Sequence, residues 1–424
     1  MCGFCLFFIL LGCGRGAGSA PATDPADTGG TGADCGAAES QACADVEVPG
    51  IEQFVPLGGT ATGPSSPCTA LRVVGAGAVN MTVEATVVVD WGAVAVTVSD
   101  PAGHELAQPG QSTVRFQLWQ SGEFFVDVVP QVEGTVAQVT LSCVDGCERA
   151  FTRYPVVMMH GLGGAGVFDG VDYFFEVRDD LEARGYLVRN PSVEAFAASE
   201  DRAASWAEIL QAYLDEGLGR KFILLAHSQG GLDARYLVSS LGFSDHVAVV
   251  DMVATPNHGT EVADVLSGTI ESGAVDPAWV DLGSLAFASL YGLAEGEASL
   301  SAQMAFLTTE NIAAFNENNP DSPDVYYASW AGLTCGSLEP TCQAERGGES
   351  VELLLEPLYL IMWAQGLDND GMVPRYSAEW GDFQGELWAD HADEIGQFED
   401  TDNPAFDHRA FYLAEVERLA ALGF

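Results

Sequence analysis

Residues 222–232 read FILLAHSQGGL, and this stretch decides the fold. The apolar run 222–225 predicts a fully buried strand, and the small residues that follow Ser228 let a helix begin at once. A serine held between a strand and a helix is typical of the nucleophile elbow G-x-S-x-G, whose strained turn keeps the hydroxyl clear of the sheet. Ala226 replaces the first glycine of that motif, and its methyl group is small enough for the turn. We therefore predict that Ser228 is a nucleophile.

The segments around this stretch alternate between apolar strands and helices. The expected strands lie at 155–159, 186–189, 222–226 and 247–254, and the expected helices at 173–184, 206–214 and 230–241. Continuously apolar strands that alternate with helices predict a parallel sheet covered on both faces. Residues 151–424 are accordingly predicted to form one α/β domain.

Residues 46–150 follow a different pattern. Short runs of β-branched and aromatic residues are separated by turn sequences, at 82–89, 93–99, 113–118, 123–129 and 136–143. This pattern predicts a small antiparallel all-β sandwich. The hairpin 121–126 resembles the final hairpins of pre-peptidase C-terminal (PPC) domains. No cluster of histidines or carboxylates in the segment suggests chemistry, so we interpret it as a spacer or binding module.

A serine nucleophile needs a base, and in a sheet of this kind the base follows the nucleophile and an acid in chain order. Four histidines follow Ser228. His246 and His258 precede the later strands where the base belongs. His391 and His408 remain as candidates.

The acid that orients this base is expected in the polar turn 367–371. Spacing alone does not separate Asp368 from Asp370. Acyl transfer also needs two backbone N–H groups directed at the developing negative charge. One is expected from Gln229, which follows the nucleophile, and the other from the glycine-rich loop 160–164. That loop is not a phosphate cradle, because no lysine follows it at P-loop spacing.

Together these residues resemble the bacterial true lipases of the pseudomonad type, which have the α/β-hydrolase fold and act on triacylglycerols. The resemblance covers residues 154–424 and rests on segments 154–162, 226–232, 255–259, 327–332, 369–371 and 391–395. It implies a catalytic triad of Ser228, Asp370 and His391. It also implies an oxyanion hole formed by the N–H groups of Leu162 and Gln229.

The resemblance further implies a structural calcium ion, Ca2+, bound beside the catalytic histidine. Its expected ligands are the carboxylates of Glu356 and Asp393 and main-chain oxygens of Gln397 and near Thr401. Oxygen ligands of this kind suit calcium. In the same family, an apolar insert corresponding to about residues 264–306 is a lid that opens at a lipid surface.

The amino terminus resembles a bacterial lipoprotein signal. An apolar run at 4–11 is too short to span a bilayer and ends just before Cys13. We predict a signal peptide at 1–12, acylation of Cys13 and a disordered tether at 13–45, with ordinary secretory cleavage as the alternative. The expected location is the outer membrane or cell surface, or the medium if the chain is secreted.

The ten cysteines of the chain fit an oxidising compartment. Removal of Cys2, Cys5 and Cys13 leaves seven, an odd number, which predicts one free thiol. Cys335 and Cys342 lie in one short loop and are the expected disulfide. A zinc site is a poor explanation for the remaining seven, because no CxxC pair or cluster of histidines occurs among them.

The charge of the chain is strongly negative. It carries 16 Lys and Arg against 61 Asp and Glu, a net charge of −45. Such a chain lacks the positive surface that nucleic acids or a polybasic membrane anchor require. Residues 151–424 alone carry −33. We interpret this acidity as adaptation to saline surroundings, which predicts a melting temperature that rises between low and molar NaCl.

These observations predict an exported serine ester hydrolase, most simply a triacylglycerol lipase. Within the class, the alternative is a short-chain esterase or polyester hydrolase. From another class, the alternative is a non-catalytic surface adhesin that binds through the sandwich. The expected partners are a lipid or ester substrate at an interface, a membrane contacted through Cys13 and the lid, and a folding chaperone.

Overall fold

The computed structural model describes residues 43, 50–63, 68–110, 112–164, 167–168, 171–268, 304–397, 403 and 405–424. All of them belong to one compact unit, Gln41–Phe424. The predicted signal peptide at 1–12, nearly all of the tether at 13–45 and most of the predicted lid lie outside the described residues. Of the lid, only its ends, 264–268 and 304–306, are described.

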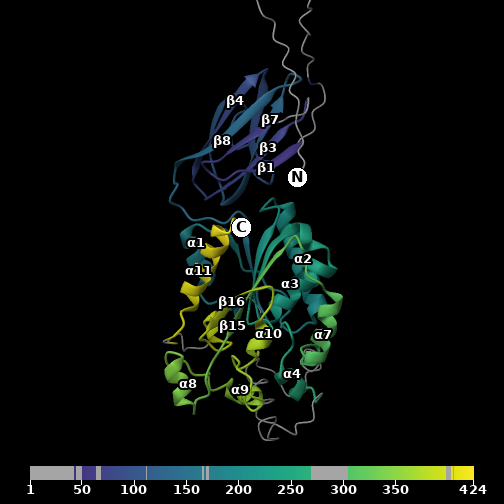
Figure 1. Cartoon of the computed structure of the whole chain (residues 1–424), viewed down its shortest axis with the longest axis vertical. Coiled ribbons are helices and arrows are strands. Elements are labelled where there is room, and N and C mark those ends of the chain that lie inside the picture. Colours follow the sequence, from purple (N-terminus) through teal and green to yellow (C-terminus); the bar gives the residue numbers. More distant parts are fainter. Residues whose placement is uncertain are drawn as a thin grey trace, which may run out of the picture. The chain divides into compact units, whose positions relative to one another are not determined.

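The first eight strands form two four-stranded sheets around a single apolar core (Figure 1). The first sheet has the order β1 (Ile51–Phe54), β3 (Leu71–Gly77), β7 (Gly122–Pro130), β5 (Val94–Ser99). The second has the order β2 (Thr60–Gly63), β8 (Val136–Asp145), β4 (Thr82–Trp91), β6 (Thr113–Gln117). In β5 and β6 buried side chains alternate with more exposed ones, as expected of strands with one face on a core.

This arrangement confirms the predicted sandwich and corrects two details. Strands β1, β2 and β3 were not expected from the sequence pattern. The sandwich is also not antiparallel throughout, because β1 pairs with β3 in parallel. The remaining pairs are antiparallel.

The following residues form a six-stranded sheet whose strands all run in the same direction. Its order is β12 (Val188–Arg189), β9 (Val156–Met159), β13 (Phe222–His227), β14 (Val247–Val253), β15 (Tyr326–Gly332), β16 (Asp382–Leu387). The central strands are buried along their whole length. This confirms the predicted parallel sheet.

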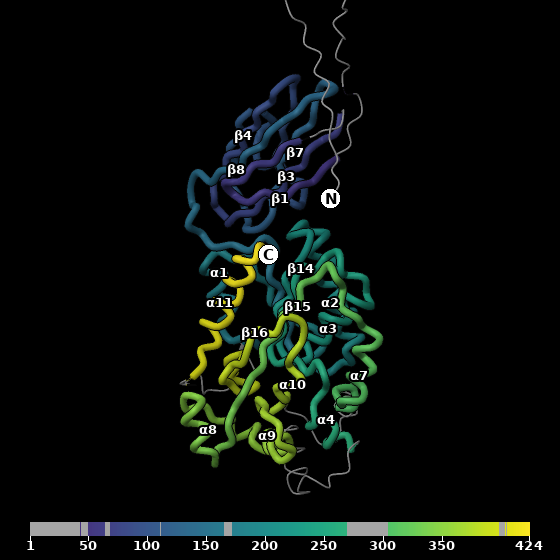
Figure 2. The backbone as a smooth tube through the Cα atoms, viewed as in Figure 1, coloured from purple at the N-terminus to yellow at the C-terminus, as the bar shows by residue number. Residues whose placement is uncertain are grey.

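Helices cover both faces of this sheet, and alternate strand residues separate the two cores. Val156 and Met158 of β9 pack in the cluster that includes α1 (Val177–Arg184) and α11 (His408–Ala421). Val157 and Met159 pack in the cluster that includes α2 (Ser199–Asp215) and α3 (Gln229–Ser240). Figure 2 shows α11, the last helix, beside α1 although they are far apart in the sequence. A parallel sheet with helices on both faces is an architecture that α/β-hydrolases share with other doubly wound α/β folds.

Shorter elements complete the fold. They are β10 (Val167–Phe168), β11 (Val171–Asp172), η1 (Phe243–His246), α4 (Glu261–Leu266), α7 (Thr309–Asn318), α8 (Pro340–Glu345), α9 (Glu356–Trp363), α10 (Arg375–Ala378) and η2 (Asp393–Ile395). Several of them follow the carboxyl ends of the parallel strands, which meet at one edge of the sheet. Among the described helices, none has the length and apolar character needed to cross a membrane.

Three disulfides occur in the described residues: Cys43–Cys68, Cys143–Cys147 and Cys335–Cys342. The last confirms the pairing expected from the short loop. Cys35, the seventh cysteine considered in the sequence, lies outside the described residues.

Candidate active site

Ser228 lies in the sharp turn between β13 and α3. Its φ of 56° and ψ of −134° are strained for a residue with a side chain. The turn is possible because the chain has glycines where other segments come close. A methyl group on Gly230 would lie 2.3 Å from the Met159 carbonyl oxygen, and one on Gly231 would lie 2.2 Å from Thr255 Oγ1. The strand, turn and helix therefore form the elbow that the sequence predicted.

The structure brings Ser228 together with the two residues that the resemblance selects. The Ser228 Oγ lies 3.0 Å from His391 Nε2, within hydrogen-bonding distance. His391 Nδ1 lies 2.9 Å from Asp370 Oδ2. All three side chains are buried at the carboxyl edge of the sheet. This is the geometry in which a base can take the serine proton while an acid orients it.

Asp370 is fixed by its own loop. Its Oδ1 accepts hydrogen bonds from the backbone N–H groups of Met372 and Val373 at 2.7 and 2.6 Å. The carbonyl oxygen of Asp370 accepts a hydrogen bond from the N–H of His391. Two contacts thus join the loop that carries the acid to the loop that carries the base.

The alternatives left open by spacing have other partners. Asp368 is 67% exposed and pairs with Arg346 at 3.1 Å. His408 begins α11, and its Nε2 donates a hydrogen bond to the carbonyl oxygen of Phe175 at 3.0 Å. The polar atoms of Asp368 and His408 that make these contacts are therefore directed to partners other than the triad residues.

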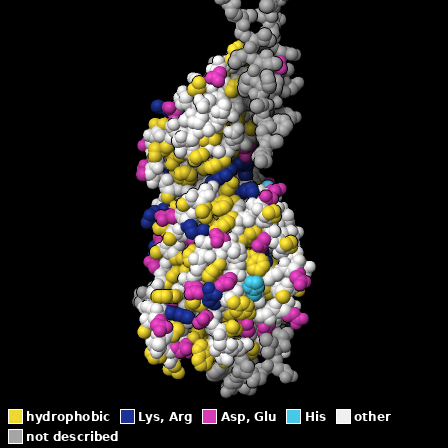
Figure 3. All heavy atoms as spheres, in the orientation of Figure 1, with side chains coloured by type: hydrophobic (Ala, Val, Ile, Leu, Met, Phe, Trp, Pro, Cys, Tyr) yellow, Lys and Arg dark blue, Asp and Glu magenta, His cyan; other side chains and the backbone are white. Residues whose placement is uncertain are grey.

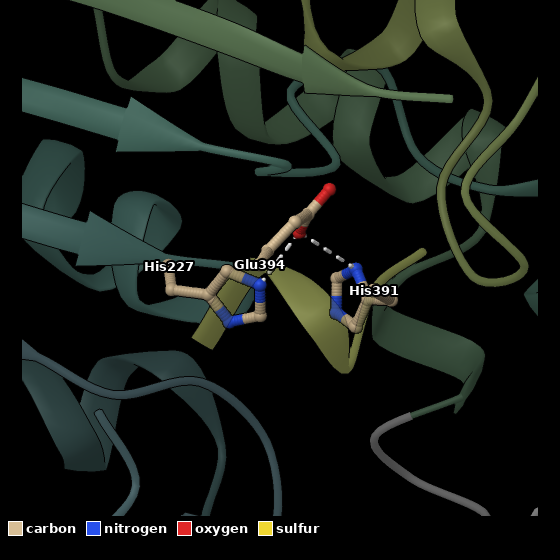
Figure 4. A group of neighbouring side chains, drawn as sticks. All are labelled: His227, His391 and Glu394. Atoms are coloured by element: carbon tan, nitrogen blue, oxygen red, sulfur yellow. Dashed lines mark hydrogen bonds and ion pairs between the residues drawn. The ribbon is translucent and has the colours of Figure 1, made fainter. Parts of the chain in front are cut away.

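A second buried group, not predicted from the sequence, lies behind the triad. Glu394 lies between two histidines, with its Oε2 2.8 Å from His227 Nε2 and 3.6 Å from His391 Nδ1 (Figure 4). Burial, and then the charge of Asp370, raises the pKa of Glu394 well above its usual value. Burial, and then His391, lowers the pKa of His227. Both shifts favour the neutral form of the group concerned, and on the other side of the ring His227 Nδ1 lies 2.8 Å from the Tyr173 hydroxyl.

The sequence carried a signal for Glu394. It lies three residues after His391, a spacing at which two side chains come close when the backbone between them turns as in a helix, and it belongs to the short helical turn η2. Space for its carboxyl group is created by Gly332 at the end of β15. A methyl group there would lie 1.8 Å from Glu394 Oε1.

The loop expected to form part of the oxyanion hole lies against Ser228. A methyl group on Gly161 would be 2.6 Å from the Ser228 Cβ, so only glycine allows this approach. His160 is fixed on both ring nitrogens, accepting from the N–H of Val193 at 3.1 Å and donating to the Gly161 carbonyl at 3.0 Å. Burial, and then Arg202, lowers the pKa of His160 to about 3, so this ring is neutral. The close approach to Ser228 is thus made by Gly161, the residue before the predicted donor Leu162.

Arg202 of α2 holds this loop in place through hydrogen bonds to its backbone. Its guanidinium donates to the His160 carbonyl at 2.6 Å and to the Glu194 carbonyl at 2.7 Å. It also pairs with Asp233 of α3 at 2.7 Å, and both side chains are completely buried. The pair therefore connects the loop to the helix that begins at the nucleophile.

An acidic cluster lies next to His391, and it contains Asp393, one of the two predicted carboxylate ligands. Carboxylate oxygens of Glu349, Asp390 and Asp393 lie within 4.8 Å of one another. Glu356 is not in this group, because it begins α9 and its carboxylate accepts from the N–H of Ser337. The structure therefore groups Glu349 with Asp393 and places Glu356 at the start of α9.

The other predicted metal ligands are placed as follows. The Gln397 side chain donates to the carbonyl oxygens of Asp172 and Tyr173. Thr401 lies outside the described residues. Burial raises the pKa of Glu349 to about 7 and that of Asp390 to about 6. Buried oxygen ligands of this kind could hold a hard cation.

The fold and the serine turn define this chain as an α/β-hydrolase. No protein-family model matches it. A triacylglycerol lipase of Vibrio cholerae serotype O1 is 30% identical over 266 residues, which cover 58% of this chain and 80% of that protein. A triacylglycerol lipase of Pseudomonas fragi is 27% identical over 297 residues, which cover 64% of this chain and 98% of that protein. The chain therefore belongs to the triacylglycerol lipase family.

The sandwich has a similar solved structure of its own. The pre-peptidase C-terminal domain of a collagenase from Bacillus anthracis matches 23% of this chain over 99% of its own length, with a TM-score of 0.20 and 10% sequence identity.

Proposed function

We propose that this chain is a serine hydrolase that cleaves carboxylic esters of lipids. Its main substrates are triacylglycerols, as for the pseudomonad-type lipases that its sequence resembles. The observation that carries the proposal is the hydrogen-bonded series from Asp370 through His391 to Ser228, at 2.9 and 3.0 Å. Membership of the triacylglycerol lipase family supports the substrate class.

In the proposed reaction, Ser228 Oγ attacks the ester carbonyl carbon while its proton passes to His391 Nε2. The tetrahedral intermediate collapses when His391 returns that proton to the leaving alcohol, which departs and leaves the acyl group on Ser228. Water then attacks the acyl-enzyme, with His391 again as base, and releases the carboxylic acid. Asp370 keeps Nε2 free to accept a proton and stabilises the imidazolium.

The negative charge on the substrate oxygen needs hydrogen-bond donors in both tetrahedral intermediates. We assign this role to the backbone N–H groups of Leu162 and Gln229. Gln229 directly follows the nucleophile and is the first residue of α3. Loss of one such donor typically raises the barrier by about 2.7 to 4 kcal/mol.

Hydrolysis of emulsified trioctanoin and of soluble p-nitrophenyl butyrate tests the proposal. Wild-type protein should hydrolyse both, with preference for the emulsion, and Ser228→Ala should lose about a thousandfold or more of either activity. A preference for the soluble ester would favour a short-chain esterase instead. Hydrolysis by Ser228→Ala at the wild-type rate would overturn the proposed mechanism.

We further propose that calcium binds beside the catalytic histidine, with carboxylate ligands from Glu349 and Asp393. Asp390 contributes less, because its carboxylate already accepts hydrogen bonds from the N–H groups of Glu352, Ala392 and Asp393. A bound cation would offset the repulsion within the cluster and stabilise the loop that carries His391.

The remaining organisation is proposed from the sequence. Residues 1–12 are a lipoprotein signal, 13–45 a tether, 46–150 a PPC-like sandwich and 151–424 the catalytic domain, with a lid at about 264–306. Export and acylation of Cys13 would place the enzyme at a membrane or outside the cell. Mass spectrometry of the mature protein tests this directly, since it should begin at a diacylated Cys13.

A further inference from the structure

The two most exposed large apolar side chains in the described residues belong to one segment. Leu338 is 90% exposed and Leu353 is 79% exposed. Trp363, at the end of α9, is 46% exposed. Isolated apolar side chains on a surface are common and need no explanation. The arrangement of these three, which we call the apolar edge, is therefore what carries the argument.

Leu338 is held outward by a fixed loop. The Cys335–Cys342 disulfide closes the loop. The Glu339 carboxylate accepts hydrogen bonds from the N–H of Gly336 and from the Tyr359 hydroxyl. Because the backbone on both sides of Leu338 is bonded, its exposure is a property of the folded loop.

Two further hydrogen bonds join the loop that carries Leu338 to both ends of α9. Glu339 accepts from Trp363 Nε1 at 2.9 Å, at the end of the helix. Glu356, at the start of the helix, accepts from the N–H of Ser337 at 3.0 Å. Leu338 lies between Ser337 and Glu339, and Leu353 occupies the turn just before α9. Figure 3 shows apolar side chains at this lower end of the molecule, over α8 and α9.

The segment is also bonded directly to the loops of the active site. Thr334 donates from its N–H to the carbonyl of Asn369, which precedes Asp370. The N–H of Glu352, next to Leu353, donates to Asp390 Oδ2 at 2.7 Å, and Asp390 precedes His391. These hydrogen bonds fix the segment that carries the apolar edge to the loops that carry Asp370 and His391, at the carboxyl ends of the parallel strands.

The chemistry of the segment selects its partner. Residues 331–367 contain five glutamates and one arginine, a net charge of −4, so an anionic surface would repel them. Exposed leucines gain free energy by leaving water, and a tryptophan with a hydrogen-bonded indole suits the boundary between lipid and water. We propose that the apolar edge inserts into the uncharged surface of a triacylglycerol droplet and holds the active site against it. This inference rests on the proposed lipid-ester hydrolysis.

Flotation with trioctanoin droplets coated with phosphatidylcholine tests the proposal. The full chain is used with Cys13→Ser, so that acylation cannot mask the effect, and with Ser228→Ala, so that the droplets are not consumed. Leu338→Ser should weaken binding about tenfold, and Leu338→Ser with Leu353→Ser about a hundredfold. Leu422→Ser is the matched control, because Leu422 is 55% exposed at the end of α11, near the opposite edge of the sheet.

Kinetics measured with chains that keep Ser228 separate this inference from the proposed function. The double variant should keep its kcat/KM on soluble p-nitrophenyl acetate within about twofold while losing activity on droplets. Unchanged droplet binding by the double variant would overturn the inference, as would an equal loss on the soluble ester. A wild-type chain that floats with droplets but hydrolyses neither substrate would overturn the proposed function and support the apolar edge.

Discussion

The buried pair of Arg202 and Asp233 gives a prediction about both stability and activity. Arg202→Met would leave the Asp233 carboxylate buried without its cation, because both side chains are fully buried. It would also remove the donors to the carbonyl oxygens of His160 and Glu194. Breaking a buried ion pair by removing one partner costs about 3 to 5 kcal/mol. At about 2 °C per kcal/mol for a large domain, the melting temperature should fall by about 6 to 10 °C.

The double variant Arg202→Met with Asp233→Leu isolates the ion pair. No unpaired charge remains in it, so it should recover at least about 1 to 2 kcal/mol relative to Arg202→Met. The two carbonyl oxygens still lack donors, which explains the deficit that should remain. Because His160 precedes the proposed oxyanion loop, kcat on p-nitrophenyl butyrate should stay low even where stability recovers.

The assay is a double-mutant cycle by chemical or thermal unfolding, with kcat measured on the same four proteins. Wild-type stability in Arg202→Met would refute the reasoning. Strictly additive losses in the double variant would do so too, because the pair would then contribute no coupling.

Three further predictions concern neighbouring features. His160 has a pKa of about 3 in the folded protein, whereas a histidine in the unfolded chain titrates near 6.5. Between these pH values only the unfolded chain binds the proton, so the free energy of unfolding falls as the pH is lowered. His160→Gln should reduce this pH dependence of the free energy of unfolding by up to about 1.4 kcal/mol per pH unit. Gly332→Ala should displace Glu394 from His227 and destabilise the fold by about 1 to 3 kcal/mol in urea unfolding, and a wild-type unfolding curve would contradict the close approach. Calcium at a hundred times its Kd should stabilise the protein by about 2.7 kcal/mol over EDTA, and Asp393→Ala should abolish the difference whereas Asp382→Ala should not.

The nucleophile could be predicted from the sequence because its signal is local. Strand, small residues, serine and helix occur within eleven consecutive positions, and each has a direct structural meaning. The base and acid were different. Sequence spacing could not decide between His391 and His408 as the base, or between Asp368 and Asp370 as the acid. Only the family resemblance decided between them. The choice depends on which loops return to the carboxyl edge of the sheet, a property of the whole fold.

The acidic cluster shows why part of the site could not be predicted. Glu349 and Glu356 are seven residues apart in a segment rich in glutamate, and alignment to the family favoured Glu356. In the fold, Glu356 accepts from the backbone at the start of α9, whereas Glu349 is buried and accepts from the Thr334 hydroxyl. Burial of one carboxylate among many is decided by tertiary packing. The short strand β1 was missed for a similar reason, because its parallel pairing with β3 is not local.

Covalent labelling of the nucleophile tests the central claim most directly. Folded wild-type protein would be treated with a fluorophosphonate probe, digested and analysed by mass spectrometry. The account predicts one phosphonylated peptide, modified at Ser228, with labelling lost in Ser228→Ala and His391→Ala and retained in Ser239→Ala. Labelling that persists in Ser228→Ala, or a wild-type protein that remains unlabelled, would contradict the claim that this chain is a serine hydrolase.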